Sequence, residues 1–431
     1  MKNTALKKFG ALFVSGVMVL AMSATAFAAE DMAGEGGVIG EFSTPDTPEA
    51  NLDTSVTIYK EITAYNPEAC TVNAPTITYS YSIAAGSAGK DIYDVSTAHS
   101  PAANVHATTK AGIGSPTITS SVVLNPNVQL NASSTGEKNT FPLKINFDGV
   151  FTGAAAGVYR YVITETCSDA AKTAAGIADG SITDTRYMDV YVDGSGRIYG
   201  YVCFAYDNNI DARDSAAAAD KVDKAFKTEG FVAGTDTASG SAVTADSYYT
   251  FNFTLSKTLV NDAFSTSHEF PFTVTLANST VTAAVLPIMT TSGNATQAAL
   301  TAGAIDGTWN PRIADGGEIS YVGIPCGTTV TINETNDVTG VTYSSESTGA
   351  DTNAAVKNIF TSEVSNNAVI NCGATACAAA RENHNNVVFT NTLLQISPTG
   401  IALRFTPFAI MLTAGVFFVV LAKKSRREDE D

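Results

Sequence analysis

The chain has 431 residues, with 25 Lys and Arg against 42 Asp and Glu, and a formal net charge of −17 at pH 7. This acidic balance argues against a nucleic-acid partner, which would require a basic face. Charged residues make up only 16% of the chain, while Thr, Val, Ala, Gly and Tyr are frequent, a composition that fits an extracellular β protein.

The N-terminus has the three parts of a signal peptide. Lysines lie among the first eight residues, an uncharged run covers 9–25, and Ala26-Phe27-Ala28 forms an A-x-A cleavage site. We therefore expect residues 1–28 to be removed on export. Residues 29–52, which combine glycine and proline with acidic and small side chains, are expected to form a flexible leader.

Most of the chain between its two ends alternates apolar and polar residues with period two, the pattern of half-buried strands. Two of the runs flank Asp193-Gly194-Ser195-Gly196, which predicts a tight hairpin. Only 211–226, rich in alanine with interspersed charge, indicates a short helix. The predicted class is all-β, with alternating runs over 56–59, 77–81, 141–145, 159–163, 188–192 and 198–202.

Two of these patterns occur twice, in the same order. A strand ending on a lysine, Val56 to Lys60, is matched by Phe253 to Lys257, and a strand bearing a glutamate, 157–166, is matched by 327–335. The repeat predicts two related immunoglobulin-like β-sandwich domains, one over 53–245 and one over 246–395.

In the second repeat, Lys257, Glu334 and Asn391 together predict a self-catalysed cross-link. A lysine amine buried among apolar side chains tends to lose its proton and becomes a nucleophile. A glutamate kept protonated in the same pocket can donate to the Asn carbonyl and move protons as ammonia leaves. The product is a Lys-Asn isopeptide bond. The alternative interpretation is that the Lys and Glu are exposed or loosely paired and that the Asn is a turn or edge residue.

The first repeat supplies Lys60 and Glu165 but has a less clear acceptor. Lys227 stands after Phe226 where an asparagine would be expected, so Asn252 is the better candidate, although it precedes Lys257 by only five residues. Lys60, Glu165 and Asn252 are therefore the predicted trio of the first domain.

The six cysteines all lie in the exported part, where disulfides persist. Cys372 and Cys377 are the candidate local pair. Zinc is not favoured, because there is no paired C-x-x-C spacing and the four histidines are scattered. Motifs of hydrolases and of dinucleotide sites are also absent, so we expect no cofactor, no metal and no enzymatic activity beyond self-catalysed cross-linking.

The C-terminus has the pattern of a sorting signal followed by a membrane helix. After Ser397-Pro398-Thr399-Gly400, residues 401–422 contain only one charge, Arg404, and a basic cluster follows over 423–427. About twenty apolar residues span a bilayer, and the basic cluster marks the cytoplasmic side. We assign 396–431 to this tail. The alternative is that Ser-Pro-Thr-Gly is a turn before a permanent helix.

The order of lysine strand, Gly-x-Tyr-x-Tyr-x-Ile-x-Glu strand, Phe-Thr-Asn-Thr strand and Pro-Thr-Gly tail resembles sortase-anchored pilins of Gram-positive bacteria. Within that group it is most similar to streptococcal-type backbone pilins with paired, isopeptide-linked immunoglobulin-like domains. The resemblance implies that a sortase cuts between Thr399 and Gly400. The new Thr399 carboxyl would then be joined to peptidoglycan or to another pilin subunit, which would place the protein at the cell surface.

The sequence departs from this family in two places. The common signal Leu-Pro-x-Thr-Gly has a residue between Pro and Thr, whereas Pro398 and Thr399 are adjacent here. This leaves open which sortase acts. No clear Tyr-Pro-Lys motif supplies an acceptor lysine for polymerisation. The alternative function is therefore an adhesin that binds a host glycan or protein through its loops, such as the polar stretch 84–119.

Overall fold

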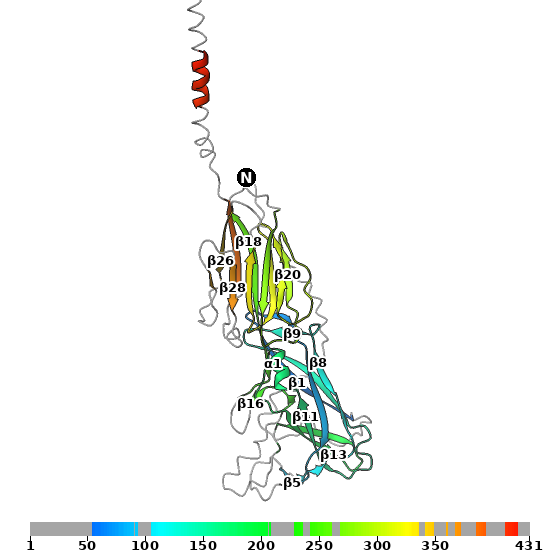
Figure 1. Ribbon diagram of the computed structural model, residues 1–431. Helices are drawn as coiled ribbons and strands as arrows, with labels where there is room; N and C mark the ends of the chain where they lie inside the picture. Colours follow the sequence, from blue (N-terminus) through cyan, green and yellow to red (C-terminus); the bar gives the residue numbers. More distant parts are fainter. Residues whose placement is uncertain are drawn as a thin grey trace, which may run out of the picture.

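The computed structural model describes residues 54–89, 91–93, 105–205, 207, 228–235, 242–260, 268–335, 341–348, 359–360, 367–371, 385–393 and 410–420. The predicted signal peptide, the leader, the helix over 211–226, the Cys372–Cys377 pair and the Pro398-Thr399-Gly400 motif lie outside these residues. Within them the structure is mostly β, as the alternating pattern predicted (Figure 1).

The first sandwich packs two sheets against each other. One contains β1 (Ser55–Tyr65), β7 (Thr117–Ile118), β10 (Glu137–Asn146), β12 (Ile177–Ala178), β15 (Gly230–Phe231) and the start of β18 (Asp246–Val260). The other has β3 (Ile77–Ala85), β6 (Lys110–Ala111), β8 (Ser121–Leu124), β11 (Gly157–Thr166), β13 (Thr185–Val192) and β14 (Ile198–Phe204). Antiparallel β13 and β14 form the predicted hairpin.

The second sandwich repeats this arrangement. Its first sheet contains the rest of β18 with β20 (Ile288–Ser292), β24 (Glu318–Pro325), β26 (Val341–Thr348) and β29 (Asn385–Leu393). Its second sheet contains β19 (Phe270–Ala277), β21 (Ala295–Thr296), β22 (Gly307–Trp309), β23 (Arg312–Ile313), β25 (Thr329–Glu334), β27 (Ile359–Phe360) and β28 (Asn367–Asn371).

Small elements complete the first domain. A short helix, α1 (Asp169–Ala174), follows β11 and begins at Ser168, whose side chain accepts from the Ala171 N–H. Three two-stranded ribbons are formed by β2 (Cys70–Asn73) with β9 (Gln129–Ala132), β4 (Asp91–Tyr93) with β5 (Val105–Thr108), and β16 (Gly234–Thr235) with β17 (Ala242–Val243).

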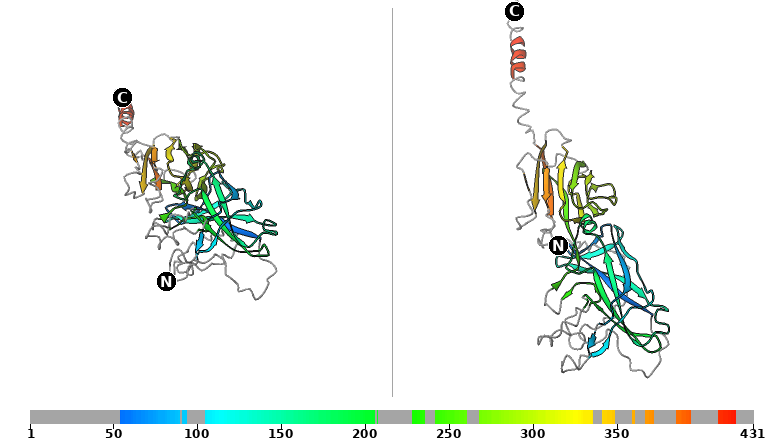
Figure 2. Two further views of the ribbon diagram at one scale, coloured as in Figure 1. Left: turned by 90° about the horizontal axis from the view of Figure 1, so that it is seen from below. Right: turned by 60° about the horizontal axis from the view of Figure 1, so that its bottom comes forward.

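The two sandwiches share one strand. Strand β18 pairs in parallel with β1 at its start. Further along, it pairs antiparallel with β24 and in parallel with β29 of the second domain. The sheet that contains β1 and the sheet that contains β24 are therefore one ten-stranded sheet. Two separate apolar cores result, with Tyr248 in the first and Phe251 in the second. The sandwiches therefore lie end to end in an elongated molecule (Figures 1 and 2).

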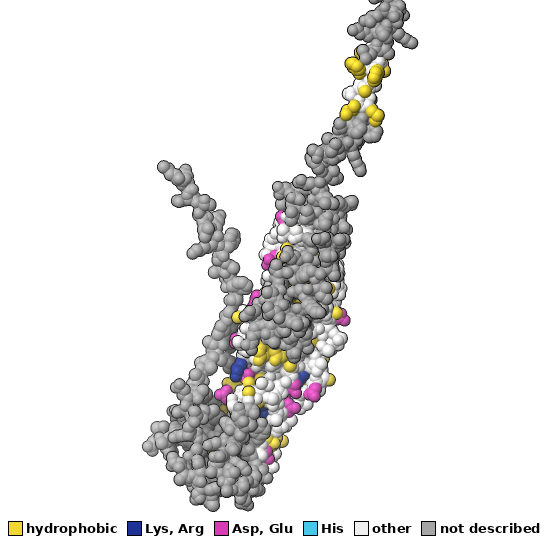
Figure 3. All heavy atoms as spheres, turned by 90° about the vertical axis from the view of Figure 1, so that its left-hand side faces the viewer, with side chains coloured by type: hydrophobic (Ala, Val, Ile, Leu, Met, Phe, Trp, Pro, Cys, Tyr) yellow, Lys and Arg dark blue, Asp and Glu magenta, His cyan; other side chains and the backbone are white. Residues whose placement is uncertain are grey.

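On the face in Figure 3, acidic and basic side chains are scattered, and hydrophobic side chains gather near the middle. The free cysteines among the described residues are Cys70, Cys167, Cys203 and Cys326. The described part of the chain includes a helix over 410–420 but holds no helix long and apolar enough to cross a membrane, so the span predicted over 401–422 stays a prediction.

Two candidate isopeptide sites

Strand periodicity places the three predicted residues of the second domain inside the sandwich. Side chains two positions apart point to the same face of a strand. Lys257 follows Leu255 on the inward face of β18, Glu334 follows Ile332 on β25, and Asn391 follows Phe389 on β29, and all six of these side chains are buried. Because β25 belongs to the sheet opposite β18 and β29, Glu334 reaches the other two across the core.

The Glu334 carboxylate contacts both of the nitrogens that the cross-link would involve. Its Oε1 lies 2.9 Å from Lys257 Nζ and accepts a hydrogen bond of 2.7 Å from Asn391 Nδ2. Lys257 Nζ also lies 4.5 Å from the centre of the Phe270 ring. One carboxylate oxygen is thus placed to take a proton from the amine and deliver it to the amide nitrogen.

The burial of this trio is difficult to explain by stability alone. The side chains of Lys257 and Glu334 are 0% exposed, and Asn391 is also 0% exposed. Desolvation can cost a fully buried ion pair more than its Coulomb attraction returns, and an apolar replacement is often as stable. In addition, Asn391 Oδ1 is buried without a hydrogen-bond partner among the described residues. This arrangement favours a chemical role over a structural one.

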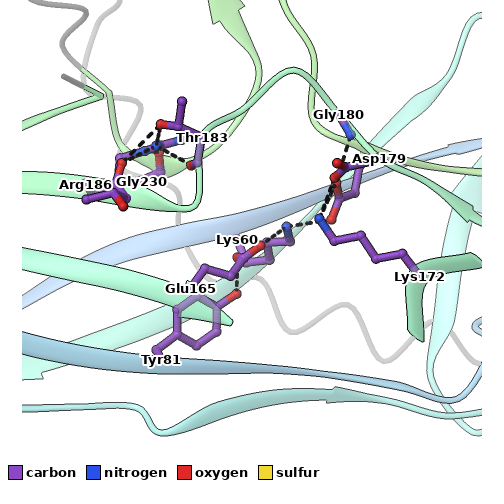
Figure 4. Close-up of polar contacts among 11 residues, drawn as sticks. Lys60, Tyr81, Glu165, Lys172, Asp179, Gly180, Thr183, Arg186 and Gly230 are labelled. Carbon is purple, nitrogen blue, oxygen red and sulfur yellow. Dashed lines mark hydrogen bonds and ion pairs between the residues drawn. The ribbon is translucent and has the colours of Figure 1, made fainter. Parts of the chain in front are cut away.

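The first domain contains a matching site, but its third member is Asp246. Lys60 Nζ lies 2.8 Å from Glu165 Oε1 and 2.9 Å from Asp246 Oδ2. Tyr81 OH donates a hydrogen bond of 2.7 Å to Glu165 Oε2 and so fixes the carboxylate (Figure 4). The ring centre of Tyr79 is 4.2 Å from Lys60 Nζ.

Strand register shows that Asp246 and Asn391 occupy equivalent positions. In the first domain Asp246 on β18 lies opposite Ile62 on β1, two residues beyond Lys60. In the second domain Asn391 on β29 lies opposite Leu259 on β18, also two residues beyond its lysine. Both pairs are parallel. In each site the third residue therefore has the same offset from the lysine.

The aromatic neighbours follow the same register. Glu165 is paired with Tyr81 across β11 and β3, and Glu334 is paired with Phe272 across β25 and β19. The ring near each lysine belongs to the residue two positions before this paired aromatic residue, which is Tyr79 in the first site and Phe270 in the second. The two domains thus have the same arrangement of lysine, glutamate and two aromatic side chains. The aromatic residues are tyrosines in the first site and phenylalanines in the second, so only the first site has phenol hydroxyl groups at these positions.

The structure does not bring Asn252 to Lys60. Its side chain is fully buried between the domains and exchanges two hydrogen bonds of 2.8 Å with the side chain of Asn66. Asn252 Oδ1 also accepts from the Gly323 N–H at 3.1 Å, and Tyr65 stacks on Tyr249 beside it. Asn252 is therefore part of the joint between the sandwiches, and Asp246 is the residue that lies beside Lys60 in the first site.

Charges around Asp246 keep it ionised. Burial would raise the pKa of this carboxyl, but Lys60, the Gly180 N–H and Lys172 outweigh burial and lower it. Burial and the carboxylates of Asp246 and Glu165 raise the pKa of Tyr79, and burial and Glu165 do the same for Tyr81. Both phenols therefore stay protonated. Asp246 follows Ala245 and so does not fit the predicted pattern of an asparagine after an aromatic residue, although its side chain also ends in a carbonyl carbon.

Comparisons with known proteins give a match to one family model and to several solved structures. Residues 251–371 match a family model described as "Domain of unknown function (DUF7601)". No curated protein matches the chain. Among solved structures, the major pilin from Streptococcus pyogenes is 18% identical with a TM-score of 0.34, over 80% of this chain and 99% of the pilin. The T3.2 major pilin of the same species is 15% identical with a TM-score of 0.33, over 79% of this chain and 100% of that one.

An adhesin from Mobiluncus mulieris that contains intramolecular disulfide, isopeptide and ester cross-links is 13% identical, with a TM-score of 0.24, over 79% of this chain and 98% of the adhesin. The structural neighbours are thus streptococcal pilins and a cross-linked adhesin, as the sequence resemblance predicted. Identities and TM-scores are low, so no function is inferred from these structures.

Proposed function

We propose that this chain is a structural cell-surface protein, a pilin or stalk subunit whose two sandwich domains are each closed by a self-formed isopeptide bond. The observation that supports this most strongly is the repeated offset of acceptor from lysine, with a buried glutamate contacting each lysine amine. A single buried ion pair is an ordinary feature, but two with the same register argue for a shared chemistry.

In the second domain, Lys257 Nζ attacks the side-chain carbonyl carbon of Asn391. The new bond joins Nζ to that carbon, and the bond from the carbon to Nδ2 breaks. Glu334 takes two protons in turn from the Lys257 ammonium and gives one of them to Nδ2, which leaves as ammonia, while the other stays on the Glu334 carboxyl. The short distances from Oε1 to both nitrogens suit this transfer.

In the first domain, Lys60 Nζ attacks the side-chain carboxyl carbon of Asp246. The carbon keeps Oδ1 and loses Oδ2, which takes two protons from the amine, one of them by way of Glu165, and leaves as water. No proton is gained or lost overall. Because Lys60 Nζ already contacts both Glu165 and Oδ2, the nucleophile and the leaving oxygen are together before reaction.

At the surface, the proposed partners are a sortase, which would cut after Thr399, and the peptidoglycan or pilin subunit that would receive the new carboxyl. The chain would act as an enzyme only on itself. With both bonds formed, tension between Lys60 and Asn391 would pass along part of β18 and two cross-links. Most of each sandwich would carry no load, which suits a stalk.

The test is the intact mass of the reduced full chain together with its Glu165→Gln and Glu334→Gln variants. One bond that releases ammonia and one that releases water give a deficit of about 35 Da in total. Each variant should show a smaller deficit than wild type, reduced by about 18 Da in Glu165→Gln and by about 17 Da in Glu334→Gln. A wild-type mass equal to the sequence value would overturn the cross-linked stalk and would favour the adhesin interpretation.

A further inference from the structure

A second buried lysine lies at the first site and has no counterpart among the described residues of the second. Lys172 belongs to α1, and its side chain is only 5% exposed. Its Nζ lies 3.5 Å from Asp246 Oδ1, the carboxylate oxygen that does not contact Lys60. Figure 4 shows Lys60 and Lys172 extending toward each other from separate elements.

The same oxygen accepts a backbone hydrogen bond. The Gly180 N–H donates to Asp246 Oδ1 at 3.0 Å. Residue 180 must be glycine for this, because a Cβ there would collide with the Thr244 carbonyl oxygen and the Ala245 backbone. The preceding strand, β12, pairs with β18 beside Asp246 and fixes the donor in place.

The helix that carries Lys172 is also held firmly. The carbonyl oxygen of Ala174 at its end accepts hydrogen bonds of 2.9 Å from the N–H groups of Thr282 and Ala283 in the second domain. The Lys172 ammonium also donates to Asp179. Burial would lower the pKa of Lys172, but Asp179 and Asp246 outweigh burial and raise it, so this amine stays charged while Lys60 supplies the nucleophile.

A carboxylate is a poor electrophile because attack by an amine places further negative charge on its oxygens. Donors fixed at the position where that charge develops lower the barrier. An amide such as Asn391 starts neutral and needs less help, and its Oδ1 has no hydrogen-bond partner among the described residues. The first site thus has two donors at Asp246 Oδ1, whereas the second has none among the described residues at Asn391 Oδ1. The site with the donors is the one that holds a carboxylate, and the site without them holds an amide.

We propose that the Gly180 N–H and the Lys172 ammonium form an oxyanion hole for Asp246 Oδ1, which allows a carboxylate to serve as the isopeptide acceptor in the first domain. This inference rests on the proposed function. Lys60 Nζ forms the bond to the carboxyl carbon, Oδ2 leaves as water, and the charge on Oδ1 in the tetrahedral intermediate is held by these two donors.

The experiment follows the cross-links as they form during cell-free synthesis of the full chain. Samples are stopped in acid at intervals and digested, and the branched peptides joining Lys60 to Asp246 and Lys257 to Asn391 are measured by mass spectrometry. The second peptide serves as an internal clock for folding, since no variant below touches that site.

We expect Lys172→Met to slow the first cross-link about tenfold or more relative to the second, less than the ~100-fold or larger loss typical of a short oxyanion contact. Lys172→Arg should restore part of the rate. Lys144→Met is the matched control, because it makes the same substitution at an exposed lysine of the first sandwich that contacts neither Lys60 nor Asp246, so its rate should stay within about twofold of wild type.

The double variant Lys172→Met with Asp246→Asn should recover the cross-link, because its acceptor is then an amide like that of the second site. A structural role for Lys172 would leave the double variant as slow as the single one, and that result would overturn the proposal. So would an unchanged or faster rate in Lys172→Met, which would mean that Lys172 only keeps Asp246 ionised.

A branched peptide that contains Lys172 in place of Lys60 would also overturn the oxyanion hole, because Lys172 would then be the nucleophile. Absence of the first branched peptide from the wild-type chain would remove the isopeptide reaction of the first domain itself, and the oxyanion hole with it. The proposed function and this inference therefore fail by different results.

Discussion

Asp246 and Lys257 lie on one uninterrupted strand, β18. Asp246 faces the core of the first sandwich and contacts Lys60, while Lys257 faces the core of the second and contacts Glu334. The proposed acceptor of one site and the proposed nucleophile of the other are therefore connected by part of a single strand. This relationship makes β18 the element on which both proposed cross-links depend.

The leaving group distinguishes the two candidate acceptors of the first domain. Asp246→Asn should keep the cross-link but release ammonia in place of water, so the total mass deficit falls from about 35 to about 34 Da. Asn252→Asp should leave the deficit unchanged. High-resolution intact mass measurement separates these results. If Asn252→Asp instead altered the deficit, the assignment of Asp246 would be wrong.

Loss of either cross-link should destabilise only its own domain. A covalent bond between Lys60 and Asp246, which are 186 positions apart, lowers the conformational entropy of the unfolded chain. In the chain-entropy model this stabilises the folded state by about 5 kcal/mol. Glu165→Gln should therefore lower the melting transition of the first sandwich, and Glu334→Gln that of the second. Differential scanning calorimetry of both variants tests this, and each serves as the control for the other. Equal effects on both transitions would contradict independent cross-links.

The joint between the domains should depend on the Asn66–Asn252 pair. Replacing either residue by alanine leaves a buried amide without its partner, at a cost of about 1–3 kcal/mol. The double variant should cost less than the sum of the two single variants, because the two hydrogen bonds between these side chains are lost only once. Urea unfolding of the wild type and the three variants provides the double-mutant cycle. Strict additivity would show that the two amides do not interact.

The unlinked first site should make stability depend on pH in the acid range. In a Glu165→Gln background Asp246 stays a free carboxylate, and its pKa in the folded state lies below the ordinary value of 3.8. Its stabilising contribution is therefore complete above the ordinary value and is lost as the pH falls through the lower folded-state pKa.

Urea unfolding at a series of pH values, from about pH 6 to about pH 2.5, measures this loss. The control adds Asp246→Asn to the same background, and the difference in unfolding free energy between the two variants should shrink toward low pH. A difference that stays constant would show that Asp246 does not gain from its ionic partners.

The sequence by itself determined the class of fold and most of the second site. Period-two alternation predicted the strands and their inward faces, and the same alternation placed Lys257, Glu334 and Asn391 on those faces. The repeat of lysine strand and glutamate strand also found Lys60 and Glu165. The predicted strands and inward faces were confirmed because they depend on local spacing, which the pleat of a strand converts directly into side-chain direction, whereas the isopeptide roles of these residues stay predictions.

Only the tertiary structure decided the third member of the first site and the donors around it. Asp246 reaches Lys60 through the parallel pairing of β18 with β1, and Lys172 reaches Asp246 through a short helix that no strand pattern indicates. Pairing between strands far apart in the chain is set by how whole sheets pack. The sequence therefore fixes which side chains point inward, and the packing of the sheets decides which of them meet.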